Sequence, residues 1–400
     1  MSILGIIAEY NPLHNGHIYH IEESTKLTNS NSIVAVISGN FVQRGEPSII
    51  DKWSRTKMAL LSGIDLVIEL PTVYAVSTAE TFAYGACKLL DSLRIIDFLS
   101  FGSEAGTITW LNKIASLLVE EPKIYKDYLK KSLSTGITYA AAREFAITNI
   151  LGENYSKFLK NSNNILAIEY LKALLKLNSK IKPLTIKRIG PDYNSLNDLK
   201  YFASATSIRH NILKGNKSFL DKCLPPVSKE ILINCFTKGL GPVSLEQFSS
   251  IILYLLRSGY DLKNVFDVGE GLENRIYKAA KMTNNIYDLI NMVKTKRYTE
   301  SRLKRILIHA LLGINSELYK SFAGPNYIRV LGFNSKGLNL LKLIHTKSNL
   351  PIITRVGSYK KSIKDCRLFE KDLFATDIYT LALKGKPASG MDLTQPIIIN

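Results

Sequence analysis

The sequence predicts an α/β fold with an open parallel sheet, a helical insertion, and a mostly helical C-terminal region that ends in a small α/β tail. Short β-branched runs recur through the first hundred residues, and amphipathic stretches separate them. This alternation is typical of a parallel sheet covered by helices. Because ligands bind beyond the carboxyl ends of the strands in such sheets, the loops after the strands are the expected place for a site.

Four apolar runs predict the first strands, at residues 3–8, 32–38, 66–70 and 95–101. In a parallel sheet the carboxyl ends of the strands meet at one edge. The loops that follow three of these runs contain His14, Gly39 and Gly102. We therefore expect these three residues to face one crevice.

The rest of the chain is predicted to be largely helical. Leu and Ile at helical spacing predict an insertion over about 107–175, after which residues 183–188 resemble a returning strand. The pattern is again helical from about 213 to 313. Apolar runs at 327–331 and 350–355 then predict a small α/β tail, whose register the sequence does not fix.

The composition is that of a globular protein, with 400 residues, of which 46% are hydrophobic and 22% charged. This length exceeds one ordinary core, so two or three domains are expected, and we divide the chain into two regions, residues 1–215 and 216–400. No apolar run is long enough to span a bilayer, and the first residues lack the basic segment of a signal peptide, so we expect a cytoplasmic protein. Scattered cysteines without a C-x-x-C pair argue against a zinc site and a disulfide framework: Cys87, Cys223, Cys235 and Cys366.

The chain is strongly basic, because 52 Lys and Arg residues outweigh 34 acidic ones and give a formal net charge of +18. Such a charge is a common footprint of nucleic-acid binding, although a lysine-rich solvated surface gives the same count. In the region 216–400 we expect one basic segment to follow a phosphate backbone, with Tyr298 stacking on a base; the alternative is a solvated helix face. Its cations are Lys294, Lys296, Arg297, Arg302, Lys304 and Arg305.

The segment after the first predicted strand carries the most specific pattern. The apolar run breaks at Asn11-Pro12 and leads directly into His14-x-Gly-His17. A helix start at this point offers unpaired backbone N–H groups and the positive end of the helix dipole, beside a glycine and two imidazoles. These features bind phosphate, and fixed donors there would stabilise the charge that develops in nucleotidyl transfer. The competing interpretation is that both histidines only cap a surface helix.

Cations after two further predicted strands suit the remaining phosphates. Lys52 and Arg55 open the helix that follows the Gly-bounded loop 38–47, and Arg188 ends the returning strand. Lysine and arginine in such positions either bind phosphate oxygens or form ordinary salt bridges.

Two predicted helix starts carry polar residues of the same kind. Asn163 precedes an apolar helix, where a carboxamide caps the helix or reads a base or ribose edge. Thr206 and Ser207 at the second helix start are followed by Arg209, which together suit a departing pyrophosphate, with capping as the alternative. The His14-x-Gly-His17 motif follows the first predicted strand, and the motif at 204–209 follows the last strand of the predicted sheet. This order is typical of a nucleotidyl-transfer site.

Together these motifs make the chain resemble the bacterial tRNA(Met) cytidine acetate ligase family, within the H-x-G-H nucleotidyltransferase superfamily. The resemblance covers nearly the whole chain. It rests on Gly5-Ile-Ile-Ala-Glu-Tyr-Asn-Pro-Leu-His-Asn-Gly-His17, Ser38-Gly-Asn-Phe-Val-Gln-Arg-Gly-Glu-Pro47, Asp51-Lys-Trp-Ser-Arg55, Phe101-Gly-Ser-Glu104, Asn163-Asn-Ile-Leu166 and residues 204–209.

The resemblance implies a nucleotidyltransferase-like, Rossmann-like domain at 1–215 and a tRNA-binding region at 216–400. It also implies a ligase that uses ATP to convert acetate to acetyl-adenylate and then acetylates the wobble cytidine of elongator tRNA(Met), forming N4-acetylcytidine. Carried over by position, the ATP site comprises Ile7, Ala8, Glu9, Tyr10, Asn11, Pro12, Leu13, His14, Asn15, Gly16, His17, Ile18, Tyr19, His20, Gly102, Asn163 and Arg188.

The expected roles divide between the α-phosphate, the two outer phosphates and the nucleotide. We expect His14, Gly16 and His17 to contact the α-phosphate, and Lys52, Ser207 and Arg209 to contact the outer phosphates. Asn163 and Arg188 are expected to contact the nucleotide. We expect Mg²⁺ to accompany ATP, because no carboxylate cluster indicates a metal cage of the protein's own.

Two other functions stay open on the residues alone. A small-molecule adenylyltransferase of cofactor synthesis would share the nucleotide site but would not need a large basic C-terminal half. A tRNA-binding protein with a disabled nucleotide site would share the basic half, although intact His14, Gly16, His17 and Arg209 speak against it. The sequence does not distinguish a monomer from a homodimer.

Overall fold

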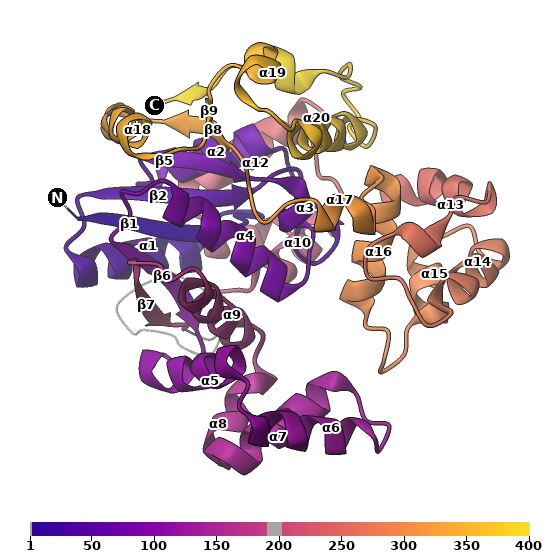
Figure 1. The fold of residues 1–400 in the computed structure, drawn as a ribbon. Helices are drawn as coiled ribbons and strands as arrows, with labels where there is room; N and C mark the ends of the chain where they lie inside the picture. Colours follow the sequence, from indigo (N-terminus) through magenta and orange to yellow (C-terminus); the bar gives the residue numbers. More distant parts are fainter. Residues whose placement is uncertain (1, 190–201) are drawn as a thin grey trace.

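The computed structural model describes residues 2–189 and 202–400, and a mostly parallel sheet lies at its centre (Figure 1). The strands follow the spatial order β10-β8-β5-β2-β1-β6-β7, with β9 paired to β8. β8 runs antiparallel to β5, whereas the other pairings in this sheet are parallel. The bounds are β1 Ile3–Ala8, β2 Ser32–Ser38, β5 Leu66–Leu70, β6 Phe98–Ser103, β7 Lys182–Lys187, β8 Ile328–Phe333, β9 Ile352–Ile353 and β10 Ile398–Ile399; β3 (Phe41–Val42) and β4 (Glu46–Pro47) form a separate hairpin.

The predicted α/β class is confirmed, and the runs 3–8, 32–38 and 66–70 coincide with β1, β2 and β5. The fourth run differs, because β6 begins only at Phe98. Ile95 and Ile96 are nevertheless buried, at 7% and 9% exposure, so they contribute to the core without pairing in the sheet. An apolar run marks burial more reliably than it marks the first paired residue of a strand.

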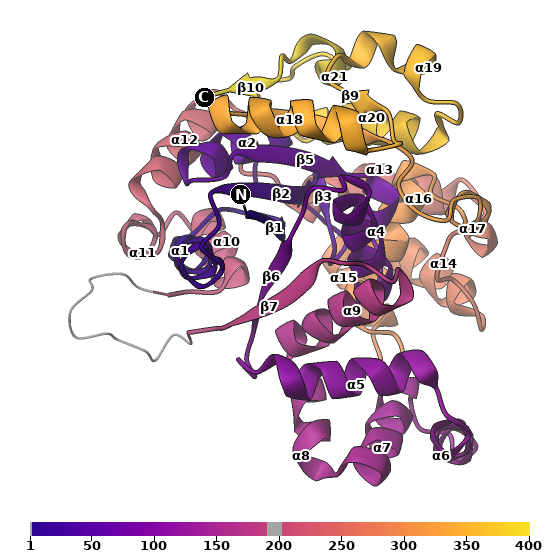
Figure 2. The ribbon, with the colours of Figure 1, turned by 60° about the vertical axis from the view of Figure 1, so that its left-hand side comes forward.

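Helices cover both faces of the sheet, because its strands send alternate side chains to opposite sides. On β2, Val34 and Val36 belong to one core, and Ile33, Ala35 and Ile37 belong to the other. The first core lies against α3 (Thr72–Ala75), α4 (Ala79–Ser92) and α9 (Ser162–Lys176). The second lies against α1 (Asn15–Thr28), α2 (Lys52–Leu61), α10 (Ala205–Leu213), α11 (Lys217–Cys223) and α12 (Pro226–Thr237), as Figure 2 shows.

Two groups of helices extend beyond the sheet. One lies between β6 and β7, where the helical insertion over 107–175 was expected: α5 (Ile108–Glu120), α6 (Lys123–Leu133), α7 (Tyr139–Leu151) and α8 (Glu153–Ser156), before α9 returns to the sheet. The other forms a lobe that we call the C-terminal lobe: α13 (Ser249–Arg257), α14 (Leu272–Met282), α15 (Ile286–Val293) and α16 (Glu300–Leu312). Figure 1 shows the insertion below the sheet and the C-terminal lobe to the right of it. Among the described residues, no helix is both long and apolar enough to cross a membrane.

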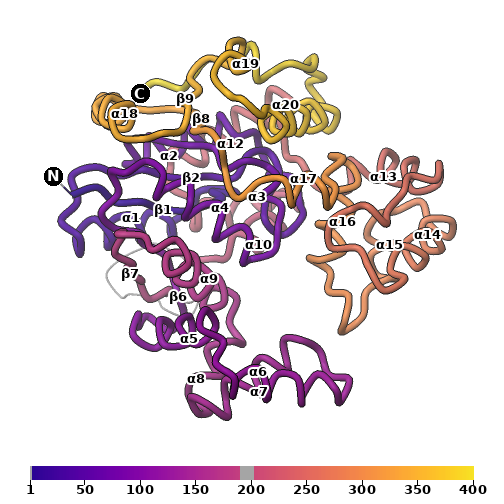
Figure 3. Tube along the Cα trace, in the orientation of Figure 1, coloured from indigo at the N-terminus to yellow at the C-terminus, as the bar shows by residue number. Residues whose placement is uncertain are grey.

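The C-terminal tail adds to the central sheet. After α17 (Ser316–Lys320), β8 pairs with β5, and the chain ends in β10 beside β8, at the end of the sheet where β1 begins (Figure 3). The sequence could not fix this register because β9 and β10 are two residues long. The sheet thus draws strands from both predicted regions, 1–215 and 216–400. The remaining helices are α18 (Ser335–Lys347), α19 (Tyr359–Ser362), α20 (Arg367–Thr380) and α21 (Met391–Thr394).

Candidate active site

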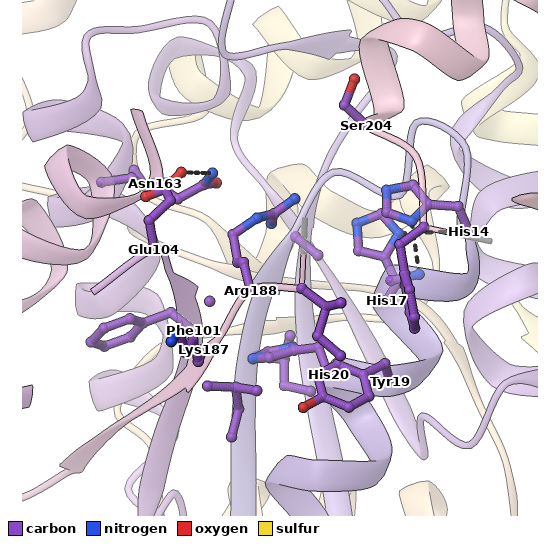
Figure 4. Close-up of a pocket in the computed structure, with 18 of the residues that line it drawn as sticks. His14, His17, Tyr19, His20, Phe101, Glu104, Asn163, Lys187, Arg188 and Ser204 are labelled. Carbon is purple, nitrogen blue, oxygen red and sulfur yellow. Dashed lines mark hydrogen bonds between the residues drawn. The ribbon is translucent and has the colours of Figure 1, made fainter. Parts of the chain in front are cut away.

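A cavity of about 370 Å³ lies at the carboxyl ends of β1, β6 and β7, beside the N-termini of α1, α9 and α10 (Figure 4). The structure brings together His14 and Gly102 there, as expected from the strand ends. Gly39 lies elsewhere, with its α-carbon beside the buried carboxylate of Glu69. The predicted ATP-site residues that line the cavity are Ile7, Ala8, Tyr10, His14, Gly16, His17, Tyr19, His20, Gly102, Asn163 and Arg188.

His14 and His17 cap the N-terminus of α1 reciprocally. The Nδ1 atom of His14 accepts a hydrogen bond from the backbone N–H of Gly16 at 3.1 Å. The Nδ1 atom of His17 accepts one from the backbone N–H of His14 at 3.2 Å. The two rings lie 3.8 Å apart between centroids. The capping interpretation and the phosphate interpretation are therefore compatible, because capping uses one nitrogen of each ring and leaves the other.

Both imidazoles are held in the neutral form. Burial lowers the pKa of His14 to about 3, and the charges of Arg188 and Arg209 act in the same direction. Burial also lowers the pKa of His17 well below its usual value, and the charges of His14 and Arg188 lower this pKa further. A neutral imidazole carries one proton, and since both Nδ1 atoms are acceptors, that proton sits on Nε2. Each ring thus offers one fixed N–H donor at the cavity.

Arg188 supplies a positive charge within the same cavity. It follows β7, and Figure 4 shows it between the two histidines on one side and Glu104 and Asn163 on the other. A Cβ on Gly102 would lie only 3.2 Å from Cγ of Arg188, so glycine lets this side chain cross the end of β6. Burial lowers the pKa of Arg188, and the charge of Glu104 opposes that shift.

The start of α10 reaches the cavity through Ser204, whose Oγ accepts the backbone N–H of Ser207 at 3.1 Å. The hydroxyl that caps this helix is therefore Ser204. Arg209 lies beside the cavity: its guanidinium donates to the backbone oxygen of Asn11 at 3.1 Å and pairs with Glu46 at 3.2 Å. Neither Ser207 nor Arg209 is among the lining residues.

The other residues of the stretch 7–20 hold the stretch in place. Glu9 accepts the backbone N–H of Gln43 at 2.8 Å, and Asn11 accepts that of Ile49 at 2.8 Å. Asn15 donates to the backbone oxygen of Lys222 at 2.9 Å. The remaining three, which also lie outside the cavity lining, are Pro12, the fully buried Leu13 and the partly buried Ile18.

Lys52 and Arg55, expected to contact phosphates, do not line the cavity, and both side chains are fully buried. The Lys52 ammonium lies 2.8 Å from carboxylate oxygens of both Glu69 and Asp392. Arg55 instead joins the ends of β1 and β2, since it donates to the backbone oxygen of Glu9 at 2.6 Å and to that of Gly39. Both cations are structural.

The basic segment 294–305 is also largely committed within the protein. Tyr298 is only 6% exposed and belongs to the hydrophobic core, so it is not available to stack on a base. Lys304 is buried and pairs with Glu46 at 2.6 Å, and Arg302 and Arg305 both pair with Asp267. Sequence proximity could not reveal these partners, because Glu46 and Asp267 lie far from the segment along the chain.

The sequence assigned no role to the other residues that line the cavity. Glu104 directly follows β6, and its place after Gly102 at a strand end was the available indication. Phe101 and Tyr170 form an aromatic wall, with ring centroids 5.5 Å apart. Their apolar character gave no indication beyond core packing.

Phosphate-binding features at the carboxyl edge of an open α/β sheet define a nucleotidyl transferase of the H-x-G-H class. The family model described as HIGH Nucleotidyl Transferase matches residues 1–392. A protein of Caldanaerobacter subterraneus named tRNA(Met) cytidine acetate ligase is 59% identical over 399 residues and covers 100% of both chains. One of the same name from Acetivibrio thermocellus is 45% identical, again over 100% of both.

A solved structure agrees with these relatives. The crystal structure of Thermotoga maritima TmcAL bound with alpha-thio ATP has a TM-score of 0.93 and 35% identity, and the match covers 100% of this chain and 99% of that one. The chain therefore belongs to the tRNA(Met) cytidine acetate ligase family. The resemblance that the motifs indicated is confirmed.

Proposed function

We propose that this chain activates acetate with ATP and then acetylates the wobble cytidine of elongator tRNA(Met) in the cytoplasm. The observation that carries the proposal is the pair of imidazoles of His14 and His17, whose Nδ1 atoms accept backbone N–H groups and which line a cavity that also holds Arg188. The chain's 59% identity over its full length to a protein named tRNA(Met) cytidine acetate ligase supports the choice of substrates.

In the first step, a carboxylate oxygen of acetate attacks the α-phosphorus of ATP. The new O–P bond forms as the bond to the pyrophosphate oxygen breaks, and the products are acetyl-adenylate and pyrophosphate. The five-coordinate transition state carries extra charge on its equatorial oxygens, and the Nε2–H groups of His14 and His17 are the donors for it. Because the rings are neutral and fixed, they stabilise that charge without a proton transfer.

The outer phosphates leave toward the start of α10. The N-terminus of this helix, where Ser204 caps the backbone N–H of Ser207, carries the positive end of the helix dipole, and Arg209 adds a guanidinium from the same helix. ATP would bring Mg²⁺ with it as a counter-ion of its phosphates. Glu104 is the one carboxylate among the described lining residues, and two N–H groups of the protein already occupy it.

In the second step, the N4 amine of the cytidine attacks the carbonyl carbon of acetyl-adenylate. A C–N bond forms, the C–O bond to AMP breaks, and the amine loses one proton to solvent. This step requires the anticodon to reach the cavity, so binding of the tRNA matters only here.

The purified protein should release pyrophosphate from ATP in an acetate-dependent reaction without tRNA. Addition of elongator tRNA(Met) should then yield one acetyl group on its wobble cytidine, measured by mass spectrometry of the digested tRNA. Pyrophosphate release that depends on a different small molecule would instead indicate a cofactor adenylyltransferase. Tight tRNA binding without any pyrophosphate release would indicate a non-catalytic binding protein.

Exposed lysines of the C-terminal lobe should contribute to tRNA binding alone. Lys281 and Lys296 are exposed on this lobe, which projects from the sheet (Figure 1). Changing both to glutamate should weaken tRNA binding and flatten its salt dependence, because each lost phosphate contact removes about 0.7 to 0.9 from the log–log slope. Adenylate formation should stay near normal.

The matched control is the exposed pair Lys342 and Lys347 on α18, at the far edge of the molecule, changed to glutamate in the same way. This variant has the same net charge, so it should bind tRNA nearly as the wild type does. Equal weakening by both variants would mean that net charge alone matters and that the C-terminal lobe is not the docking surface. Binding and salt slope can be measured together by filter binding at several salt concentrations.

A further inference from the structure

Glu104 links the end of β6 to the start of α9 at the edge of the cavity (Figure 4). One carboxylate oxygen accepts a hydrogen bond from Nδ2 of Asn163 at 2.6 Å. The other accepts the backbone N–H of Asn164 at 2.9 Å, in the first turn of α9. Glu104 therefore both caps this helix and holds a side chain that lines the cavity.

The chemistry of the carboxylate decides which way Asn163 points. A carboxylate only accepts hydrogen bonds, so the carboxamide must turn its Nδ2 donor toward Glu104 and its Oδ1 acceptor away from it. No hydrogen bond to Oδ1 is found within the described part of the chain. The cavity is thus offered an oriented acceptor, which a freely rotating asparagine would not provide.

A further hydrogen bond fixes the backbone around Glu104 and Asn163. Asn164 is 2% exposed, and its Oδ1 accepts the backbone N–H of Ala105 at 2.9 Å, which ties the first turn of α9 to the residue after Glu104. Arg188 faces the same carboxylate from β7, and the charge of Glu104 stabilises its protonated form. Glu104 consequently sits between the two cavity residues that were predicted to hold the nucleotide.

We propose that Glu104 is a positioning residue that makes the cavity selective for a hydrogen-bond donor on the nucleoside, through Oδ1 of Asn163. Two donors of ATP fit this chemistry, the N6 amine of adenine and a ribose hydroxyl. Guanine has an oxygen where adenine has its N6 amine, so Oδ1 would find no partner there. The proposal rests on ATP being the substrate of the proposed function and adds the means of its selection.

The test is Glu104→Gln, which replaces one acceptor oxygen by an NH₂ group. If the remaining oxygen caps α9, the new NH₂ faces Asn163 and turns its carboxamide, so a donor replaces the acceptor in the cavity. The KM for ATP should rise about 10-fold, the effect of one hydrogen bond, with little change in kcat. The assay is acetate-dependent pyrophosphate release with ATP, ITP, 2′-deoxy-ATP and 3′-deoxy-ATP.

The wild type should discriminate against the analogue that lacks the recognised donor. Glu104→Gln should lose that discrimination and no other. ITP identifies the N6 amine as the donor, and the deoxy analogues identify a hydroxyl. Asn163→Ala should lose the same discrimination, and combining the two changes should add little, because both remove one interaction. A variant that only weakens α9 would instead lower the melting temperature and reduce the rate with every nucleotide equally.

The two failures are distinguishable. If the wild type shows no acetate-dependent reaction with ATP, the proposed function is wrong. If the wild type reacts but Glu104→Gln keeps the full discrimination among the four nucleotides, Glu104 does not position Asn163 and the present proposal is overturned.

Discussion

Replacing His17 with asparagine should lower the rate of acetate-dependent pyrophosphate release about 100-fold or more, while ATP affinity changes much less. Asparagine is chosen because its Oδ1 can replace Nδ1 as the acceptor for the backbone N–H of His14, which His17 accepts at 3.2 Å. It has no atom at the position of Nε2. The change therefore keeps the cap of α1 and removes only the donor at the cavity.

His17→Gln is the matched control for the same site. Glutamine can place its Nε2 donor near the position of the imidazole Nε2, but it loses the local acceptor that caps His14. We expect it to retain more activity than His17→Asn and to have the lower melting temperature. The two variants separate the catalytic donor from the cap.

The comparison needs single-turnover rates, ATP binding by calorimetry and thermal unfolding of each variant. Full activity in a folded His17→Asn protein would show that the Nε2–H group does not stabilise the transition state. Because burial holds the pKa of His14 at about 3 and that of His17 well below its usual value, the two rings stay neutral as the pH falls from 8 to 5. We therefore expect no loss of rate from protonation of these rings over that range.

Local patterns in the sequence were sufficient for the features that depend on neighbours along the chain. β1 and β2 are short β-branched runs buried on both faces, and the reciprocal cap of α1 involves only His14, Gly16 and His17. The glycine at 102 and the polar residues at strand ends likewise follow from topology, because parallel strands bring their carboxyl ends together. These features place the cavity correctly.

Features that depend on distant partners were not predictable in the same way. Lys52 follows a conspicuous loop and precedes a helix, which is a favourable position for binding phosphate, yet its partner Asp392 comes from α21 near the end of the chain. Tyr298 stands among cations in the sequence but turns into the hydrophobic core. A cation in a sequence shows that a charge must be satisfied, and only the three-dimensional arrangement shows whether a ligand or a carboxylate satisfies it.

The antiparallel tail illustrates the same limit. β8 pairs with β5 through residues that are far apart along the chain, and its buried Arg329 reaches both Glu69 and Asp392. Lys52 and Arg329 thus balance Glu69 and Asp392 inside the protein. This buried cluster joins α2 and β5 of the first half to β8 and α21 of the tail, and each half contributes one cation and one carboxylate to it.

Replacing Lys52 with methionine should lower the free energy of unfolding by about 3–5 kcal/mol, because it leaves a buried carboxylate without its counter-charge. Glu69→Gln provides the decisive comparison. Alone it should destabilise the protein, since it removes a partner that lies 2.8 Å from the Lys52 ammonium. In the Lys52→Met background it should instead stabilise the protein, because it removes the charge that has become unpaired.

The measurement is urea-induced unfolding of the four proteins of this cycle, with Lys342→Met as an exposed control that should shift the free energy of unfolding by no more than about 0.5 kcal/mol. Acetate-dependent pyrophosphate release per folded molecule should stay near normal in Lys52→Met, because Lys52 does not line the cavity. A stably folded Lys52→Met protein that had lost this reaction would show that the ammonium acts on the phosphates. The reversal of sign for Glu69→Gln is the stronger criterion, since a phosphate-binding lysine at a solvated site would give no such coupling with a carboxylate in the interior of the sheet.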